Sequence, residues 1–171
     1  AIFAPVGWRA VGLMFAFALS NIVITMAVGA TVEALGTTAG NAGIAEAAKL
    51  SGAELPNFFA KVAVQLLGEE LVTILPFLGI LTFCRQRAGL GRNAAVLVAG
   101  LVSAAAFGLI HLPAYDWNLI QCLVVIGSAR LVLTWAYVWS KNIWVSTGAH
   151  IINDWALIAS TIFLLPLATS T

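Results

Sequence analysis

Long apolar runs dominate this sequence and restrict what the chain can fold into. They lie at about residues 10–31, 57–83, 94–112, 117–139 and 143–167. About 20 helical residues cross the ~30 Å hydrocarbon core of a bilayer, since each residue adds ~1.5 Å. Hydrophobic residues make up 61% of the 171-residue chain and charged residues only 9%, whereas soluble domains carry roughly a quarter charged residues. The sequence therefore predicts an all-α, polytopic bundle of about five transmembrane helices.

The remaining composition narrows the class further. The formal net charge is +1, so no excess of basic residues is present to bind a nucleic-acid backbone, and we expect no nucleic-acid partner. Two widely separated cysteines, Cys84 and Cys122, indicate neither a disulfide framework nor a thiolate metal site. Without an internal repeat, residues 1–171 are expected to form a single membrane-embedded domain. The first run resembles a signal sequence but exceeds a ~7 to 15 residue h-region, so we expect a retained helix.

The charges between the runs predict how the chain is oriented. Residues 31–56 carry three Glu and one Lys among many Ala and Gly, which indicates a solvent-facing loop with one short surface helix. With the N-terminus inside, most cations near the ends of the runs lie in the cytoplasm, as the positive-inside rule requires. These cations are Arg9, Arg85, Arg87, Arg92 and Lys141. We therefore expect a multi-pass protein with a cytoplasmic N-terminus and an external C-terminus, and its compactness favours a bacterial inner (plasma) membrane.

Ionisable residues inside the apolar runs are the strongest functional signal. A charged group at mid-bilayer costs at least ~2.5–3.5 kcal/mol on insertion scales, so such residues face the bundle interior, pair with one another or line a wet cavity. Here they are Glu69, Glu70, His111, Arg130, His150 and Asp154. Their concentration in one small bundle indicates a functional site.

The spacing of these residues predicts how they are grouped. Glu69 and Glu70 point about 100° apart on a helix, so only one of them can face fully into a shared cavity. His150 and Asp154 are four residues apart and share one helix face. His111 is followed by Leu-Pro, which places it close to a helix end or kink.

Together, these groups are the parts of a hydrolytic site that lacks a covalent nucleophile. A glutamate is a candidate general base, an imidazole can share the proton of a water, and neighbouring donors can stabilise an oxyanion. No serine lies in a Gly-x-Ser-x-Gly motif, which disfavours a serine hydrolase. Zinc held by two His and a Glu is a weaker alternative, because no His-Glu-x-x-His motif is present. Acids used only for helix packing, or for proton movement in a carrier or channel, stay open as alternatives.

The order of these motifs resembles the CPBP family of membrane proteins, which includes the CAAX prenyl endopeptidases and bacteriocin-processing or immunity relatives. The resemblance covers about residues 66–157 and rests on Glu69-Glu70, then Phe107-x-x-x-His111 followed by Leu-Pro, then His150-x-x-x-Asp154. It implies a glutamate-dependent intramembrane endopeptidase without metal or cofactor, whose partners are a peptide or membrane-protein substrate and membrane lipid. In this interpretation Glu69 and His111 activate a water and Glu70 orients them. His150 and Asp154 then stabilise the tetrahedral intermediate.

Two positions depart from the family pattern. The family's first motif is Glu-Glu-x-x-x-Arg, but Ile74 occupies the arginine position. Arg130 in the fourth run either replaces that arginine as the cation of the acid pair or snorkels toward the cytoplasm. Asp154 stands where the family often has Asn, and an ionised Asp cannot donate a hydrogen bond. Either Asp154 is protonated, or it orients His150, or Asn153 takes its place.

The missing arginine also favours the main alternative function, a non-proteolytic immunity or scaffold protein.

The depth of the site residues in the membrane is a second difficulty. At ~1.5 Å per residue, straight helices place Glu70 and His150 at similar depths but His111 nearer the outer surface by ~10 Å or more. We therefore expect the third helix to break or shift near Pro113.

Overall fold

The computed structural model describes residues 2–36 and 38–163, and within them it contains helices and turns but no strand. The helical elements, in chain order, are α1 (Trp8–Ala34), α2 (Ala42–Ala47), α3 (Glu54–Gln86), α4 (Arg92–Ile110), the 3₁₀ turn η1 (Leu112–Tyr115), the π-helix η2 (Gln121–Ile126), α5 (Gly127–Ser140) and α6 (Ile143–Phe163). The all-α, single-domain fold expected from the sequence is confirmed, and α2 is the short helix expected in the loop after the first run.

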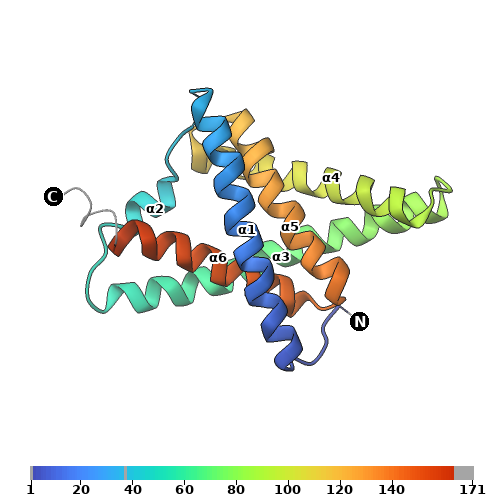
Figure 1. Ribbon diagram of the computed structural model, residues 1–171, viewed down its shortest axis with the longest axis horizontal. Helices are drawn as coiled ribbons and strands as arrows, with labels where there is room; N and C mark the ends of the chain where they lie inside the picture. The colour runs from blue at the N-terminus through green and yellow to red at the C-terminus, as the bar shows by residue number, and fades with distance from the viewer. Residues whose placement is uncertain (1, 37, 164–171) are drawn as a thin grey trace.

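The long helices form two crossing sets (Figure 1). α3 extends along the molecule, with α6 beside its N-terminal half and α4 beside its C-terminal half. α1 and α5 cross this set and pack against each other and against α6. The middle of α3, which carries the two adjacent glutamates, therefore lies where helices from both sets meet.

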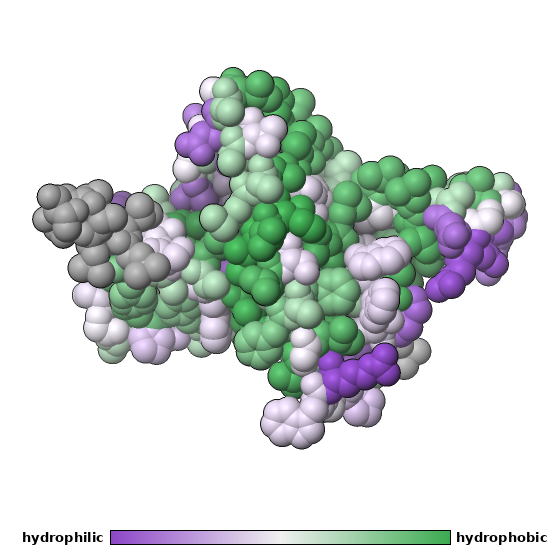
Figure 2. Space-filling view, in the orientation of Figure 1, coloured by the Kyte–Doolittle hydropathy of each residue, from purple (hydrophilic) through white to green (hydrophobic). Residues whose placement is uncertain are grey.

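Helices in the described part of the chain fit an integral membrane protein. Four are long and apolar enough to cross a membrane: α1, α3, α4, and η2 with α5 as one helix of 20 residues. Large apolar side chains on α1 are exposed, among them Phe15, Leu19, Val23 and Met26. Figure 2 shows a broad hydrophobic surface over the centre of the molecule, with hydrophilic residues gathered toward its ends. Such an apolar surface is suited to contact with lipid.

The fifth apolar run forms α6, which is not among those four helices. Its middle contains His150, Asn153 and Asp154, and these polar residues lower its hydropathy. α6 packs against α1, α3 and α5, and His150 and Asn153 are buried while Asp154 is partly exposed. The last four residues of the predicted run, 164–167, lie outside the described residues.

The expected break after the third run is present. α4 ends at Ile110 with His111 as its C-cap, and the chain turns through η1, which contains Pro113. The chain then enters η2, whose backbone comes very close to α4. A Cβ atom added at Gly108 would lie 2.4 Å from the carbonyl oxygen of Cys122, so only glycine permits this approach. The local π-helical geometry of η2 is the kind of irregularity that concentrates at functional sites.

Candidate active site

A buried ion pair between Glu70 and Arg130 lies at the centre of the site. Both residues are fully buried, one on α3 and the other on α5. The guanidinium donates Nη1–H to Oε1 of Glu70 at 2.5 Å and Nη2–H to Oε2 at 3.1 Å. This two-bond geometry is the strong form of an arginine–carboxylate pair. Arg130 therefore pairs with Glu70 instead of snorkelling, and it supplies this glutamate with the cation that Ile74 cannot.

The same carboxylate also holds His150 of α6. Nδ1 of His150 lies 3.0 Å from Oε1 of Glu70. A carboxylate paired with an arginine accepts hydrogen bonds only, so Nδ1–H of His150 is the donor. This bond sets the orientation of the ring and leaves Nε2 on the side of Asp154, whose Oδ1 is 3.8 Å away.

Glu69 points to another side of α3, as the 100° separation of neighbours requires, and lies beside His111. Oε2 of Glu69 and Nε2 of His111 are 3.8 Å apart, and the two side chains are 18% and 20% exposed. His111 Nδ1 is 2.8 Å from the carbonyl oxygen of Phe107. Because a carbonyl only accepts, Nδ1 carries the proton and Nε2 of the neutral ring is an acceptor. Gln65 donates Nε2–H to Oε1 of Glu69 at 2.8 Å, which holds that carboxylate in place.

Phe107 joins the two groups of residues. Its ring centroid is 4.3 Å from that of His111 and 6.3 Å from that of His150. The guanidinium carbon of Arg130 lies 5.3 Å from the same centroid, within range of a cation–π contact. The structure thus places the predicted residues in two groups, Glu69 with His111 and Glu70 with His150 and Asp154, and the Phe107 ring lies near a histidine of each group.

Asp154 and Asn153 complete the α6 side. Asn153 is buried and donates Nδ2–H to Oδ1 of Asp154 at 2.8 Å. At 3.8 Å from His150 Nε2, Asp154 is beyond direct hydrogen-bond distance, which leaves room for a bridging group. Its carboxyl group nevertheless lies next to the one nitrogen of His150 that Glu70 does not occupy.

Two residues near the site were not predicted from the sequence. Gln65 lies one helical turn before Glu69, a spacing that could have indicated it. Tyr115 of η1 carried no such signal. Burial raises the pKa of the Tyr115 hydroxyl, and the nearby charges of Asp154 and Glu69 raise it further, whereas a hydrogen bond with Asn41 lowers it. Tyr115 therefore lies close to the acids of both groups, from a turn after α4.

The described side chains also bear on metal binding. Within residues 2–36 and 38–163, no three His, Cys, Asp or Glu side chains lie close enough together to hold a metal ion. The grouping of two histidines and a glutamate that a zinc site needs is therefore not formed there. Cys84 and Cys122 are both buried and free.

The chain is similar to a known protein family. Residues 51–156 match a family model described as type II CAAX prenyl endopeptidase Rce1-like. The matched range begins just before α3 and ends within α6, so it includes both groups of residues and Phe107. No curated protein and no solved structure matches the chain.

Proposed function

Because the chain belongs to the Rce1-like family of type II CAAX prenyl endopeptidases, we propose that it hydrolyses peptide bonds with a water activated by Glu69 and His111. Family membership confirms the resemblance drawn from the motifs. It makes the protein a CAAX protease-type peptidase at the level of the family, acting on peptide or protein substrates in membranes. The mechanism and the roles of single residues are our proposal.

The gap between Glu69 and His111 is the observation that carries this proposal. Two acceptor atoms 3.8 Å apart can each receive one hydrogen from a single water, which leaves the water's lone pairs free to attack a carbonyl carbon. The proton released on attack passes to this pair, which returns it to the nitrogen of the leaving amine as the C–N bond breaks. Both side chains are partly exposed, so water and substrate can reach them, whereas the fully buried Glu70 is out of reach.

In our proposal, His150 of the second group stabilises the negative charge that develops on the oxygen of the attacked carbonyl group. When His150 is protonated, its Nε2–H can donate to the oxyanion of the tetrahedral intermediate. Glu70 holds the ring in this orientation through Nδ1, and Arg130 neutralises Glu70. Asp154, when ionised, cannot donate a hydrogen bond itself, so its role is to hold and balance His150. The arginine missing from the family motif is thereby replaced, which weakens the case for a non-proteolytic scaffold.

The cellular setting completes the proposal. Family membership and the four apolar helices support an integral membrane protein. We propose a cytoplasmic N-terminus on the basis of the cations near the helix ends, and a bacterial inner membrane on the basis of the compactness of the chain. We propose that the reaction needs neither metal nor cofactor, because a carboxylate and an imidazole suffice to activate water.

Purified protein in detergent, assayed with a library of quenched peptides, tests the mechanism. Glu69→Ala and His111→Ala are each expected to lower the rate at least ~100-fold, the usual contribution of general acid–base catalysis. His150→Ala is expected to be similarly impaired. Glu33→Gln removes an exposed acid at the end of α1 and serves as the matched control, with wild-type activity expected.

A chelator is added in a parallel series. Unchanged activity supports a metal-independent site, whereas loss of activity that zinc restores would contradict it. A fully active Glu69→Ala protein would overturn the assignment of the base. Thermal unfolding of each variant separates loss of catalysis from loss of folding.

A further inference from the structure

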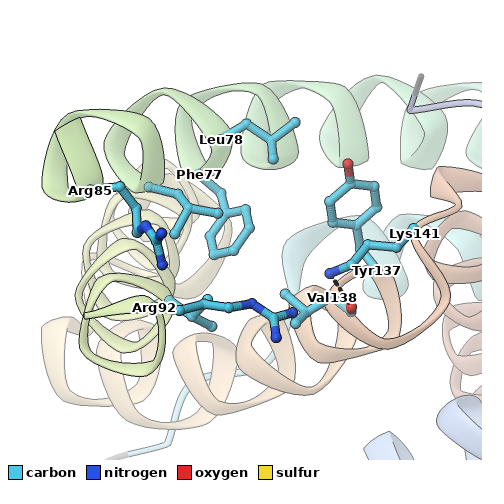
Figure 3. Close-up of a pocket in the computed structure, with 9 residues that line it drawn as sticks. Phe77, Leu78, Arg85, Arg92, Tyr137, Val138 and Lys141 are labelled. Carbon is cyan, nitrogen blue, oxygen red and sulfur yellow. Dashed lines mark hydrogen bonds between the residues drawn. The ribbon is translucent and has the colours of Figure 1, made fainter. Parts of the chain in front are cut away.

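A cavity of about 430 Å³ lies between α3, α4 and α5, away from the residues proposed for catalysis (Figure 3). Phe77, which lines it, is seven residues beyond Glu70 on α3, or about two helical turns and ~10 Å along the axis. The cavity continues from there toward the turn that joins α3 to α4. The proposed reaction makes no use of it.

Three cations surround this cavity. Arg85 lies in the last turn of α3, Arg92 begins α4, and Lys141 follows the end of α5. Figure 3 shows Arg85 at one end of the cavity and Lys141 at the other, with the Arg92 side chain extending from the Arg85 end toward Val138 and Lys141. In the part of the chain that the structure describes, no carboxylate forms an ion pair with any of the three. The cavity therefore has a strongly positive rim.

The hydrogen bonding and the pKa of Lys141 reflect its position at this cavity. Its Nζ donates a hydrogen bond to the carbonyl oxygen of Val138 at 2.5 Å, at the end of α5. Burial lowers the pKa of Lys141, and the charge of Arg92 lowers it further. An anion between these cations would relieve their mutual repulsion.

The wall of the cavity is apolar, in contrast to its rim. Phe77 and Tyr137 are buried and belong to the core cluster that joins α3, α4, α5 and α6. Leu81, Val96 and Val138 are partly buried and pack against that cluster. The cavity thus combines a rigid apolar wall, formed within membrane-spanning helices, with cations at the ends of those helices.

We propose that this cavity binds an anionic phospholipid, with the phosphate between Arg85, Arg92 and Lys141 and an acyl chain along the apolar wall. The three cations lie at helix ends on one side of the bundle. The ends of membrane-spanning helices are at the depth of the lipid headgroups. Basic pockets between helices at this level recognise anionic headgroups. The volume is in the range of sites that hold a small ligand, enough for a headgroup and the adjoining part of a chain. A free phosphate would use the rim but leave the apolar wall without a function.

Such a lipid would connect the α3–α4 turn to the end of α5. It binds only when these elements are packed together, so it is expected to stabilise the folded protein by mass action. Phosphatidylglycerol is the test lipid, and phosphatidylcholine, with no net charge, is its control.

The experiment measures lipid retention by native mass spectrometry and thermal unfolding in detergent during lipid titration. Phosphatidylglycerol is expected to bind and to raise the unfolding temperature, and phosphatidylcholine to do neither. Arg85→Gln, Arg92→Gln and Lys141→Gln are each expected to weaken phosphatidylglycerol binding about fivefold. Arg87→Gln is the matched control. Arg87 is an exposed cation in the same turn as Arg85 but does not line the cavity, so lipid binding is expected to be unchanged.

Three outcomes would overturn the proposal. Equal weakening by Arg87→Gln and the cavity variants would mean general attraction to a basic surface. Equal binding of phosphatidylcholine would remove the role of the cations. Glycerol 1-phosphate that competes as tightly as the lipid would identify a soluble phosphate as the ligand. Unfolding temperatures without lipid show whether each variant is folded, so that a loss of binding is interpretable.

Discussion

At the scale of single residues, the contact between Glu70 and Arg130 determines how the buried part of the site is held. The two side chains have no exposure to solvent, so each charge depends on its partner for compensation. Arg130 also lies over Phe107, and Glu70 also holds His150. Loss of this pair would therefore disturb both groups of residues at once.

A double-mutant cycle tests that dependence. Arg130→Leu leaves a buried carboxylate without its cation, and Glu70→Gln leaves a buried guanidinium without its anion, so each is expected to cost about 3–5 kcal/mol of stability. The double variant removes both charges and is expected to lose less than the sum of the single losses. Equilibrium unfolding in detergent measures these free energies, and full additivity would contradict the pairing.

Arg130→Lys sharpens the same test. An ammonium group is a compact donor that cannot reproduce the two parallel bonds of a guanidinium. The lysine variant is therefore expected to be more stable than Arg130→Leu but clearly less stable than wild type. Arg87→Leu, at an exposed position, serves as the control and is expected to change stability by less than about 0.5 kcal/mol.

At the scale of elements, the contact between α4 and η2 places His111. A side chain at Gly108 would meet both the oxygen and the carbon of the Cys122 carbonyl group, at 2.4 and 3.0 Å. Backbone atoms cannot rotate away as a side chain can, so any added volume must separate the two helices. His111 caps the end of α4 three residues after Gly108, so such a separation would move it away from Glu69.

Gly108→Ala is accordingly expected to cost about 1–3 kcal/mol of stability and to lower peptidase activity through displacement of His111. Gly100→Ala is the matched control on the same helix. Its Cβ would lie 3.6 Å from a methyl carbon of Leu131, an ordinary contact, and alanine favours helix over glycine by up to about 1 kcal/mol. The free energy of unfolding and the peptidase activity are measured for both variants. Equal stability and activity of the two variants would contradict a tight backbone contact between α4 and η2 at Gly108.

The boundaries of the elements illustrate what local sequence can predict. The break after α4 was predictable because proline disfavours helix at the residue before it, and α4 does end just before His111. The π-helical form of η2 was not predictable. It accompanies the close approach of the preceding helix, α4, at Gly108, and nothing in the residues of η2 alone specifies that contact.

At the scale of the whole molecule, orientation in the membrane is the property to test. Cations near helix ends favour a cytoplasmic location for the α3–α4 turn and an external location for α2. Arg87 and Glu46 are exposed in these two segments, and the native Cys84 and Cys122 are buried. Cysteines introduced at these two exposed positions can therefore be labelled from opposite sides of the membrane, with little background labelling of the native cysteines.

In intact cells, a membrane-impermeant maleimide is expected to label Glu46→Cys but not Arg87→Cys. Both variants should be labelled after the membrane is permeabilised, because both sites are exposed to water in the folded protein. The unmodified chain gives the background from the native cysteines. Labelling of Arg87→Cys alone in intact cells would reverse the proposed orientation.

The sequence by itself determined the class of this protein, the approximate limits of its long helices and the set of residues proposed for its active site. Those properties are local: the length of an apolar run, the effect of a proline, the cost of a charge in lipid. The family motifs, with the departure at Ile74, could also be recognised from residue order alone.

Only the tertiary structure decided which of these residues meet. Arg130 and Glu70 are 60 positions apart, and sequence left the choice between this pair and snorkelling open. Three features depend on how α4, α5 and α6 cross α3: the division of the acids between His111 and His150, the closeness of Phe107 to both imidazoles, and the cavity under Arg85, Arg92 and Lys141. Crossing angles arise from the packing of whole helix faces, and the period of one helix does not encode them.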